Sequence, residues 1–357
     1  MNELYGVASD VHLHNWSAFA EGKVNGVNQR LTIILEALEQ AAKEIVERGG
    51  DRLVITGDLF HVRGSITPSV INPAQKTFKN MIRAGLTEIV VLAGNHDLES
   101  KNSSALTNAC ETLSNLDAVR VISNPLICET RKAVYIPWYD DNDELMIAIK
   151  QFRDNVEGDV SEYDLFIHAG IDDVLPTMPG KGIDPDDLVA LGFRYVCCGH
   201  YHNHKEVRAN VFSVGALTHQ TWSDVDTLAG YMIIDGDAVE HLETNAPKFV
   251  DYDASIVAKE SDAVDLCEGN YIRVKVNAAA QSEVEEMRRW LISEIGAKNC
   301  IIQAAPKSKV VRRAGAKVKA SSLRESIGTF IDSKSTAVKV ADLTKECEDI
   351  LSLTVEV

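Results

Sequence analysis

The sequence predicts an α/β fold in which layers of helices cover two β-sheets. Short apolar runs that favour strands alternate with longer segments whose apolar residues recur at helical spacing. A second observation is that polar residues capable of chemistry follow directly after several of the apolar runs. In an open α/β sheet, ligands gather at the carboxyl ends of the strands. The 357 residues are 45% apolar, which is enough for a sizeable core.

The first third of the chain shows this alternation most clearly. Strands are expected where short apolar runs occur, at residues 4–9, 53–55 and 88–93. Helices are expected between and after them, at residues 30–48, 73–84 and 103–114. We place the start of the second helix at Asn72-Pro73, because proline is favoured at the first helical position. Ser103 or Ser104 is expected to cap the third.

The middle of the chain predicts a second sheet. Further strands are expected at residues 119–122, 133–136, 165–168 and 195–200. An acidic helix is expected near residues 142–156. Three more apolar runs, near Val207 and at residues 211–214 and 230–234, indicate antiparallel strands that close the second sheet.

The composition changes after the main domain, which we expect to span residues 1–245. A boundary is expected near Ala246-Pro247, followed by a small α+β cap at residues 246–305 with β-α-β order. The remaining segments are a basic linker at residues 306–324 and two short C-terminal helices within residues 325–357. The linker carries seven Lys and Arg residues and no acidic one. It either contacts DNA phosphates or tethers the helices near an acidic partner.

Charge and cysteine content narrow the class of protein. A formal net charge of -17 argues against general adhesion to nucleic acid. It is still compatible with a nuclease whose contacts are local and whose metal ions carry positive charge. No apolar run approaches the ~18 residues of a membrane span, and the first residues lack the basic region of a signal peptide. The seven scattered cysteines form no CxxC motif, so we expect reduced thiols in a cytoplasm.

Five polar motifs follow apolar runs, and together they predict a binuclear metal site. They are Asp10-x-His12, Gly57-Asp58, Gly94-Asn95-His96-Asp97, His168 and Gly199-His200-x-His202. Carboxylate, imidazole and amide groups are typical ligands of divalent ions of intermediate hardness. Each motif alone is weak, because a lone histidine is more often part of the core and Asn and Asp favour turns. All five in this order, each just past an apolar run, seldom arise by chance.

In order and spacing, the motifs resemble those of the calcineurin-like metallophosphoesterases, over residues 4–235. The resemblance implies a layered core of two sheets that binds two divalent ions. It also implies the ligands, which are Asp10, His12, Asp58 and His202 for one ion and Asp58, Asn95, His168 and His200 for the other. Asp58 would therefore bridge the ions, and His96 would be the catalytic histidine beside the leaving oxygen. Asp97 either orients His96 or caps the next helix, and we expect the cap.

Several features resemble a narrower group, the SbcD family of nuclease subunits, which includes phage-encoded members. His61 follows Asp58 by three residues, the third motif ends in Asp97 rather than Glu, and residues 136–138 read Ile-Pro-Trp. The cap, linker and terminal helices match that family in length and order. The resemblance implies a Mn²⁺-dependent enzyme, with Mg²⁺ as the alternative metal. It implies exonuclease action on duplex DNA ends and endonuclease action on single strands, within a DNA repair and recombination complex.

The same resemblance implies partners for the chain. A homodimer would form through helices near residues 73–84 and 103–114, although their apolar stripes also suit ordinary core faces. The helices within residues 325–357 would bind the coiled coil of an SbcC-type ABC ATPase, unless they pack on their own domain. His61 would lie beside the DNA end, or it would only orient the metal ligands.

Two other functions are compatible with the sequence. A phosphodiesterase or phosphatase for small nucleotides would share the fold and the metals, which do not decide the substrate. A non-catalytic scaffold of the same fold usually lacks some of the ligands, whereas every ligand position is filled here. Four further histidines have no motif role and are expected at the surface or in support of the ligands: His14, His204, His219 and His241.

Overall fold

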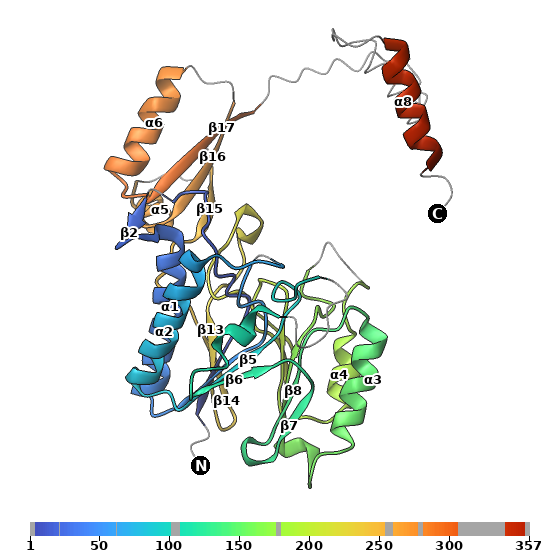
Figure 1. The fold of residues 1–357 in the computed structure, drawn as a ribbon. Helices are drawn as coiled ribbons and strands as arrows, with labels where there is room; N and C mark the ends of the chain where they lie inside the picture. The colour runs from blue at the N-terminus through green and yellow to red at the C-terminus, as the bar shows by residue number, and fades with distance from the viewer. Residues whose placement is uncertain are drawn as a thin grey trace. The chain divides into compact units, whose positions relative to one another are not determined.

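Figure 1 shows a computed structural model of the chain, which divides into two compact units. The first unit spans Met1–Ala305 and the second spans Pro306–Val357. The structure describes residues 4–20, 22–61, 63–100, 108–175, 180–253, 260–277, 281–305 and 340–353. The predicted basic linker and the first of the two predicted C-terminal helices lie outside the described residues.

Six strands form the first sheet, in the order β14-β13-β1-β4-β5-β6. They are β1 (Tyr5–Ala8), β4 (Arg52–Ile55), β5 (Glu88–Leu92), β6 (Val119–Ile122), β13 (Tyr231–Asp235) and β14 (Ala238–Leu242). β1, β4, β5 and β6 run parallel, whereas β13 pairs antiparallel with β1. The prediction that residues 230–234 belong to the second sheet is therefore wrong. Both faces of β13 are buried, so its apolar pattern does not indicate which sheet it joins.

The second sheet has the strand order β11-β12-β10-β9-β8-β7. These strands are β7 (Leu126–Cys128), β8 (Ala133–Ile136), β9 (Asp164–His168), β10 (Val196–Gly199), β11 (Lys205–Arg208) and β12 (Val211–Ser213). β8, β9, β10 and β12 run parallel, so only β11 and β7 are antiparallel to their neighbours. The prediction that the runs near Val207 and at residues 211–214 form antiparallel strands of this sheet is therefore correct for β11 against β12.

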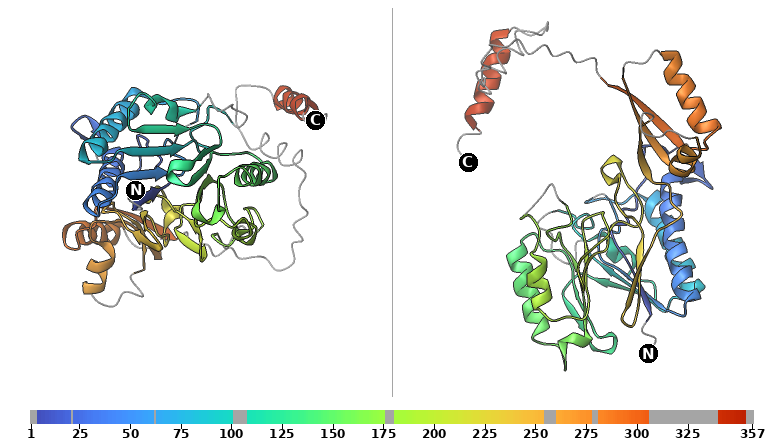
Figure 2. Two further views of the ribbon diagram at one scale, coloured as in Figure 1. Left: turned by 90° about the horizontal axis from the view of Figure 1, so that it is seen from below. Right: turned by 180° about the vertical axis from the view of Figure 1, so that it is seen from behind.

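The two sheets pack face to face between two layers of helices (Figure 2). Helices α1 (Gln29–Glu47) and α2 (Pro68–Ala84) lie on the first sheet, and α3 (Asn142–Arg153) and α4 (Pro185–Ala190) lie on the second. Alternate residues of the parallel strands enter different clusters. Val7 and Val54 pack between the sheets, whereas Ala8 and Ile55 pack under the helices. Burial on both faces explains why these strands are continuous apolar runs, and the predicted layered α/β class is confirmed.

Short elements connect these layers. They are the hairpin β2 (Lys23–Val24) and β3 (Val27–Asn28), with the 3₁₀ helices η1 (Ala109–Leu113), η2 (Glu129–Arg131), η3 (Val160–Glu162) and η4 (Trp222–Asp224). The continuous helix predicted from Ser103 or Ser104 to residue 114 is wrong. Asn108 is extended and forms a β-bridge with Leu98, so no helix can pass through it. Residues 101–107 lie outside the described part of the chain.

The cap consists of three parallel strands and two helices. They are β15 (Phe249–Tyr252), β16 (Tyr271–Asn277) and β17 (Asn299–Ala305), with α5 (Glu260–Cys267) and α6 (Gln281–Ser293). The cap has its own apolar cluster, but it belongs to the same compact unit as the two-sheet core. Buried Arg30 of α1 contributes to this contact, since its guanidinium lies 5.2 Å from the ring centre of Phe249 and 5.5 Å from that of Tyr271.

Helix α2 begins earlier than the sequence indicates. The start predicted at Asn72-Pro73 is wrong, because Thr67 and Pro68 form the first turn and Pro73 lies inside the helix. An internal proline removes a backbone hydrogen bond and costs about 3 kcal/mol. Burial of Phe78 offsets part of this cost, since a buried side chain of that size contributes roughly 1.5–3 kcal/mol.

In the second unit, the structure describes one helix, α8 (Val340–Leu353). This helix matches the second of the two predicted C-terminal helices. Among the described residues, no helix of the chain is both long enough and apolar enough to cross a lipid bilayer.

A buried carboxylate of the second sheet joins the two sheets through a hydrogen bond from Tyr5, and removal of the arginine that pairs with this carboxylate is expected to destabilise the protein. Asp164 of β9 is fully buried, accepts a hydrogen bond from Tyr5 of β1, and pairs with Arg194 at 2.6 and 2.8 Å. Arg194→Ala leaves a buried charge without its counter-ion, so the free energy of unfolding should fall by about 3 kcal/mol in urea titrations. Arg208→Ala, which breaks exposed ion pairs, is the control and should have little effect. Equal losses in both variants would contradict this interpretation.

Candidate metal centre

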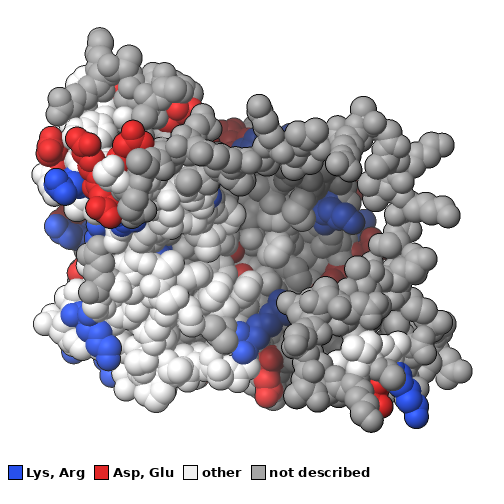
Figure 3. All heavy atoms as spheres, turned by 90° about the horizontal axis from the view of Figure 1, so that it is seen from above, with Lys and Arg blue, Asp and Glu red and all other residues white. Residues whose placement is uncertain are grey.

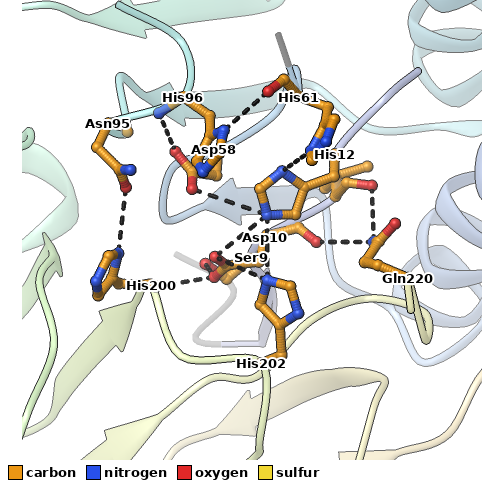
Figure 4. Close-up of polar contacts among 12 residues, drawn as sticks. Ser9, Asp10, His12, Asp58, His61, Asn95, His96, His200, His202 and Gln220 are labelled. Atoms are coloured by element: carbon orange, nitrogen blue, oxygen red, sulfur yellow. Dashed lines mark hydrogen bonds and ion pairs between the residues drawn. The ribbon is translucent and has the colours of Figure 1, made fainter. Parts of the chain in front are cut away.

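The predicted ligands lie at the carboxyl ends of β1, β4, β5, β9 and β10. Figure 4 shows those from β1, β4, β5 and β10 facing one another, and His168 of β9 contacts Asn95 among them. Four of them have a positive φ, namely Asp10 (47°), His12 (51°), Asp58 (53°) and His200 (105°). Non-glycine residues rarely adopt this conformation, and such backbone strain concentrates at functional sites. The strand ends therefore turn sharply where each ligand is presented.

Two glycines allow the loops to approach one another closely. A Cβ atom at Gly57, whose φ is 104°, would lie 2.1 Å from Nδ1 of His168. A Cβ atom at Gly94 would lie 2.3 Å from the backbone nitrogen and from Oδ1 of Asp58. The glycine that precedes Asp58 and the glycine that precedes Asn95 thus have a steric role in packing the ligands together.

One cluster of donor atoms contains Asp10, His12 and His202, with Asp58 beside it. Nε2 of His12 lies 3.2 Å from Nε2 of His202 and 3.8 Å from both Asp10 Oδ1 and Asp58 Oδ2. Nε2 of His202 lies 4.0 Å from Asp10 Oδ1. The four side chains therefore direct their donor atoms at one small volume.

A second cluster contains Asp58, His168 and His200, with Asn95 beside it. Nε2 of His168 lies 3.4 Å from Asp58 Oδ1 and 3.0 Å from Asn95 Oδ1. Nδ1 of His200 lies 3.1 Å from the same Asn95 oxygen. Asp58 thus faces the first cluster with Oδ2 and the second with Oδ1.

The protonation of these groups reflects burial and the Asp58 charge. Burial alone would raise the pKa of Asp58, but the nearby imidazoles of His168 and His12 outweigh it and hold that pKa below its usual range. Burial likewise opposes a charge on His168, yet Asp58 raises the pKa of His168 to about 9. Burial lowers the pKa of His12 to about 3 and that of His200 to about 4. Cation binding requires neutral imidazoles, a state that burial already favours in His12 and His200, whereas His168 must release its proton to the solvent.

Two buried oxygen atoms fit the presence of metal ions. Oδ1 of Asp10 is buried and accepts no hydrogen bond from the described residues. The side-chain oxygen of Asn95 faces only hydrogen-bond acceptors. A buried acceptor without a donor costs about 1–3 kcal/mol, and a cation at each cluster would satisfy both oxygens. The donor set therefore fits a pair of divalent ions.

Residues that orient the histidine ligands were missed by the sequence analysis. Nδ1 of His202 donates to the Asp224 carboxylate at 2.8 Å, and Nδ1 of His168 donates to the Thr56 carbonyl at 2.7 Å. Both histidines consequently present Nε2 to the centre. A carboxylate behind a metal-binding histidine fixes its tautomer and raises its basicity.

A second missed contact holds the loop after β1. The buried side chain of Gln220 donates to the backbone carbonyls of Asp10 and Val11 at 3.3 and 3.2 Å. One sequence signal could have found this region. Thr221 and Asp224 form a capping box around η4, and that pattern is recognisable as Thr-x-x-Asp.

His96 and His61 lie together beside the first cluster. The backbone nitrogen of His96 donates to Asp58 Oδ1, and its Nδ1 donates to the His61 carbonyl, each at 2.8 Å. Nε2 of His96 is therefore the nitrogen left to carry or release a proton. The His61 ring stacks on His96 with 5.4 Å between centroids, and its Nδ1 lies 3.3 Å from Nδ1 of His12. This placement is compatible with both roles proposed for His61, which are a position beside the DNA end and the orientation of the metal ligands.

Asp97 does not have the role expected from the sequence. Its carboxylate accepts hydrogen bonds from the backbone nitrogens of Gly94 (2.9 Å), Phe60 (2.8 Å) and Leu59 (3.2 Å). The prediction that Asp97 caps the next helix is therefore wrong, because η1 begins only at Ala109. Burial and the Asp58 charge raise the pKa of Asp97 to about 7. Asp97 joins the loop after β4 to the loop after β5, a contact between distant segments that sequence spacing cannot reveal.

Other predicted residues surround the centre. Trp138 packs 5.1 Å from His200 between ring centroids, which places the Ile-Pro-Trp stretch against the second cluster. His14 packs 5.3 Å from His61. The histidines without a motif role are otherwise engaged elsewhere, since His204 and His241 stack on each other at 4.0 Å and His219 accepts from the backbone of the cap.

Comparisons with known proteins identify a family and a related sequence. A family model described as calcineurin-like phosphoesterase matches residues 5–204. Exonuclease subunit 1 of Enterobacteria phage T4 is 26% identical over 225 residues, which is 61% of this chain and 61% of that protein. The chain therefore matches less than two thirds of the length of this relative.

Solved structures resemble the chain only loosely. They include the nuclease MPE of Pseudomonas putida, at 15% identity, 67% coverage of this chain, 87% of that chain and a TM-score of 0.29. A dimetal phosphatase from Danio rerio has 10% identity, 65% coverage of this chain, 92% of that chain and a TM-score of 0.34.

The contact between His202 and Asp224 generates a prediction about metal affinity. Asp224→Ala removes the carboxylate that orients His202, so Mn²⁺ affinity in calorimetric titrations should fall roughly 10- to 100-fold. Asp186→Ala, which removes an exposed carboxylate on α4, is the control. Unchanged affinity in Asp224→Ala would show that His202 needs no such support or is not a ligand.

Proposed function

The chain belongs to the calcineurin-like phosphoesterase family, and we propose that it is the nuclease subunit of a DNA end-processing complex. Members of the family bind a dinuclear metal centre, and the complete donor set described above supports phosphoester hydrolysis by this chain. The similarity to an exonuclease subunit is the observation that favours DNA as the substrate.

The residues present would hold two divalent ions. Asp10, His12 and His202 belong to one, Asn95, His168 and His200 belong to the other, and Asp58 is shared. Bound divalent ions at such a pair of sites supply Lewis-acid activation and neutralise charge on the phosphate. Mn²⁺ is the proposed metal, with Mg²⁺ as the alternative. Mg²⁺ is usually bound through one or two carboxylates and several waters, whereas the donor set here contains four imidazoles.

His96 is the proposed general acid. Its Nδ1 is held by the His61 carbonyl and its backbone nitrogen by Asp58, so the imidazole is fixed beside the shared carboxylate. A proton on Nε2 can then pass to the leaving oxygen of the phosphodiester. A positioned acid of this kind typically contributes ~10²–10⁴-fold to the rate.

The surroundings of the centre bear on how DNA approaches. Trp16 lies 4.4 Å from His61 between ring centroids, so the proposed DNA-end residue is part of an aromatic cluster beside the centre.

Acidic side chains gather on the cap in Figure 3, and α5 and α6 contain many Asp and Glu residues. That face of the cap repels phosphates, and we expect DNA to reach the centre by another side.

Partner binding is the second part of the proposal. Helix α8 belongs to a compact unit separate from the catalytic one, which suits a docking element for an SbcC-type coiled-coil ATPase.

A homodimer through α2 is also proposed. The apolar stripe of α2, including Val70 and Phe78, packs into the core of its own domain. Such a dimer would therefore use the polar outer face of α2.

Nuclease activity is tested with purified protein, Mn²⁺ and 3′-labelled duplex DNA, with and without the ATPase subunit. We expect release of labelled nucleotide, and a loss of about 10²-fold or more in His96→Ala because the leaving oxygen is no longer protonated. His61→Ser should lower duplex-end cleavage and spare single-strand cleavage if His61 lies at the DNA end. His241→Gln, outside the centre, is the matched control.

Three results would count against the proposal. Hydrolysis of cyclic nucleotides or mononucleotides without any cleavage of duplex ends would favour the small-nucleotide alternative. Absence of bound metal would favour a scaffold. Full activity in His96→Ala would remove the general-acid assignment while leaving the metal centre intact.

A further inference from the structure

Arg63 lies at the edge of the metal centre and has no role in the function proposed so far. It follows His61 in the loop between β4 and α2, and its side chain is half-buried. Its Nε atom is buried without a hydrogen-bond partner among the described residues. Its Nη2 atom lies 3.0 Å from the side-chain amide of Asn95, which is a predicted ligand of the second cluster.

The amide of Asn95 can adopt two orientations, which differ in what Arg63 meets. In one orientation the nitrogen donates to Nδ1 of His200 at 3.1 Å and the oxygen accepts from Nη2 of Arg63 at 3.0 Å. In the other orientation the oxygen faces the second cluster and the nitrogen faces Arg63. A ligand to a cation must use the oxygen, so metal binding selects the second orientation.

Metal binding therefore removes the acceptor from Arg63. With the Asn95 oxygen turned to the second cluster, Nη2 faces another donor at 3.0 Å, and Nε still lacks a partner. Among the described residues, no carboxylate forms an ion pair or a hydrogen bond with Arg63. The buried Nε atom is then left without an acceptor, and the planar set of guanidinium donors matches the oxygens of a phosphate.

We propose that Arg63 binds a non-bridging oxygen of the substrate phosphodiester once the metal ions are in place. This inference rests on the phosphoester hydrolysis proposed above and adds a residue that contacts the substrate. Arg63 would place positive charge beside the phosphate on the side of Asn95. Metal binding thereby prepares the anion site, because it frees the guanidinium at the moment when the centre becomes competent.

The test measures binding of inorganic phosphate to the full-length, Mn²⁺-loaded protein by calorimetry. Arg63→Ala should weaken phosphate binding roughly 10- to 100-fold, since a hydrogen-bonded charge is lost. Arg63→Lys should give an intermediate affinity, because the ammonium keeps the charge but not the planar fork. Arg120→Ala, an exposed arginine on β6, is the matched control and should bind as the wild type does.

Mn²⁺ affinity provides a second measurement that does not depend on turnover. Arg63→Ala should bind Mn²⁺ more tightly than the wild type, because the metal-free state loses the bond from Arg63 to Asn95 and the loaded state loses a nearby positive charge. Weaker Mn²⁺ binding would make Arg63 a structural support and overturn the proposal, as would wild-type phosphate affinity in Arg63→Ala. Failure of DNA cleavage alongside the expected phosphate result would contradict only the nuclease function.

Discussion

The burial of the Asp58 carboxylate is the constraint on which the rest of the structure depends. Only 1% of this residue is exposed, and its charge must be balanced inside the protein. The backbone nitrogen of His96 and the imidazole of His168 balance part of it. Oδ1 of Asp10, a second buried carboxylate oxygen, has no hydrogen-bond donor among the described residues and adds to the imbalance. The structure is consequently incomplete without cations, and a shared carboxylate between two ions resolves the imbalance.

The fold serves this arrangement by bringing strand ends from both sheets to one place. β1, β4 and β5 deliver Asp10, Asp58 and Asn95 from the first sheet, while β9 and β10 deliver His168 and His200 from the second. Face-to-face packing of buried strands fixes these ends relative to each other, and positive φ angles turn the side chains inward. The rigid core therefore maintains the strained loops that hold the ligands.

The sequence predicted most of the first sheet, because apolar runs are local, and the ligands implied by the family resemblance are side chains that the structure brings together. An apolar run followed by Gly-Asp or by Gly-Asn-His-Asp identifies a strand and its loop together. What it could not predict depends on contacts between distant segments. Asp97 bonds to the loop after β4, Asp224 supports His202 from η4, and β13 joins β1 although its own pattern fits either sheet. The start of α2 was mistaken because Thr67-Pro68 and Asn72-Pro73 offer the same local signal.

The central claim is that Asp58 is shared by two cation sites, and Mn²⁺ stoichiometry after equilibrium dialysis tests it most directly. We expect two ions per chain for the wild type, one for Asp10→Asn, and essentially none for folded Asp58→Asn, because only Asp58 belongs to both clusters. Circular dichroism would establish that each variant is folded. If Asp58→Asn kept as much Mn²⁺ as Asp10→Asn, the shared carboxylate would be wrong.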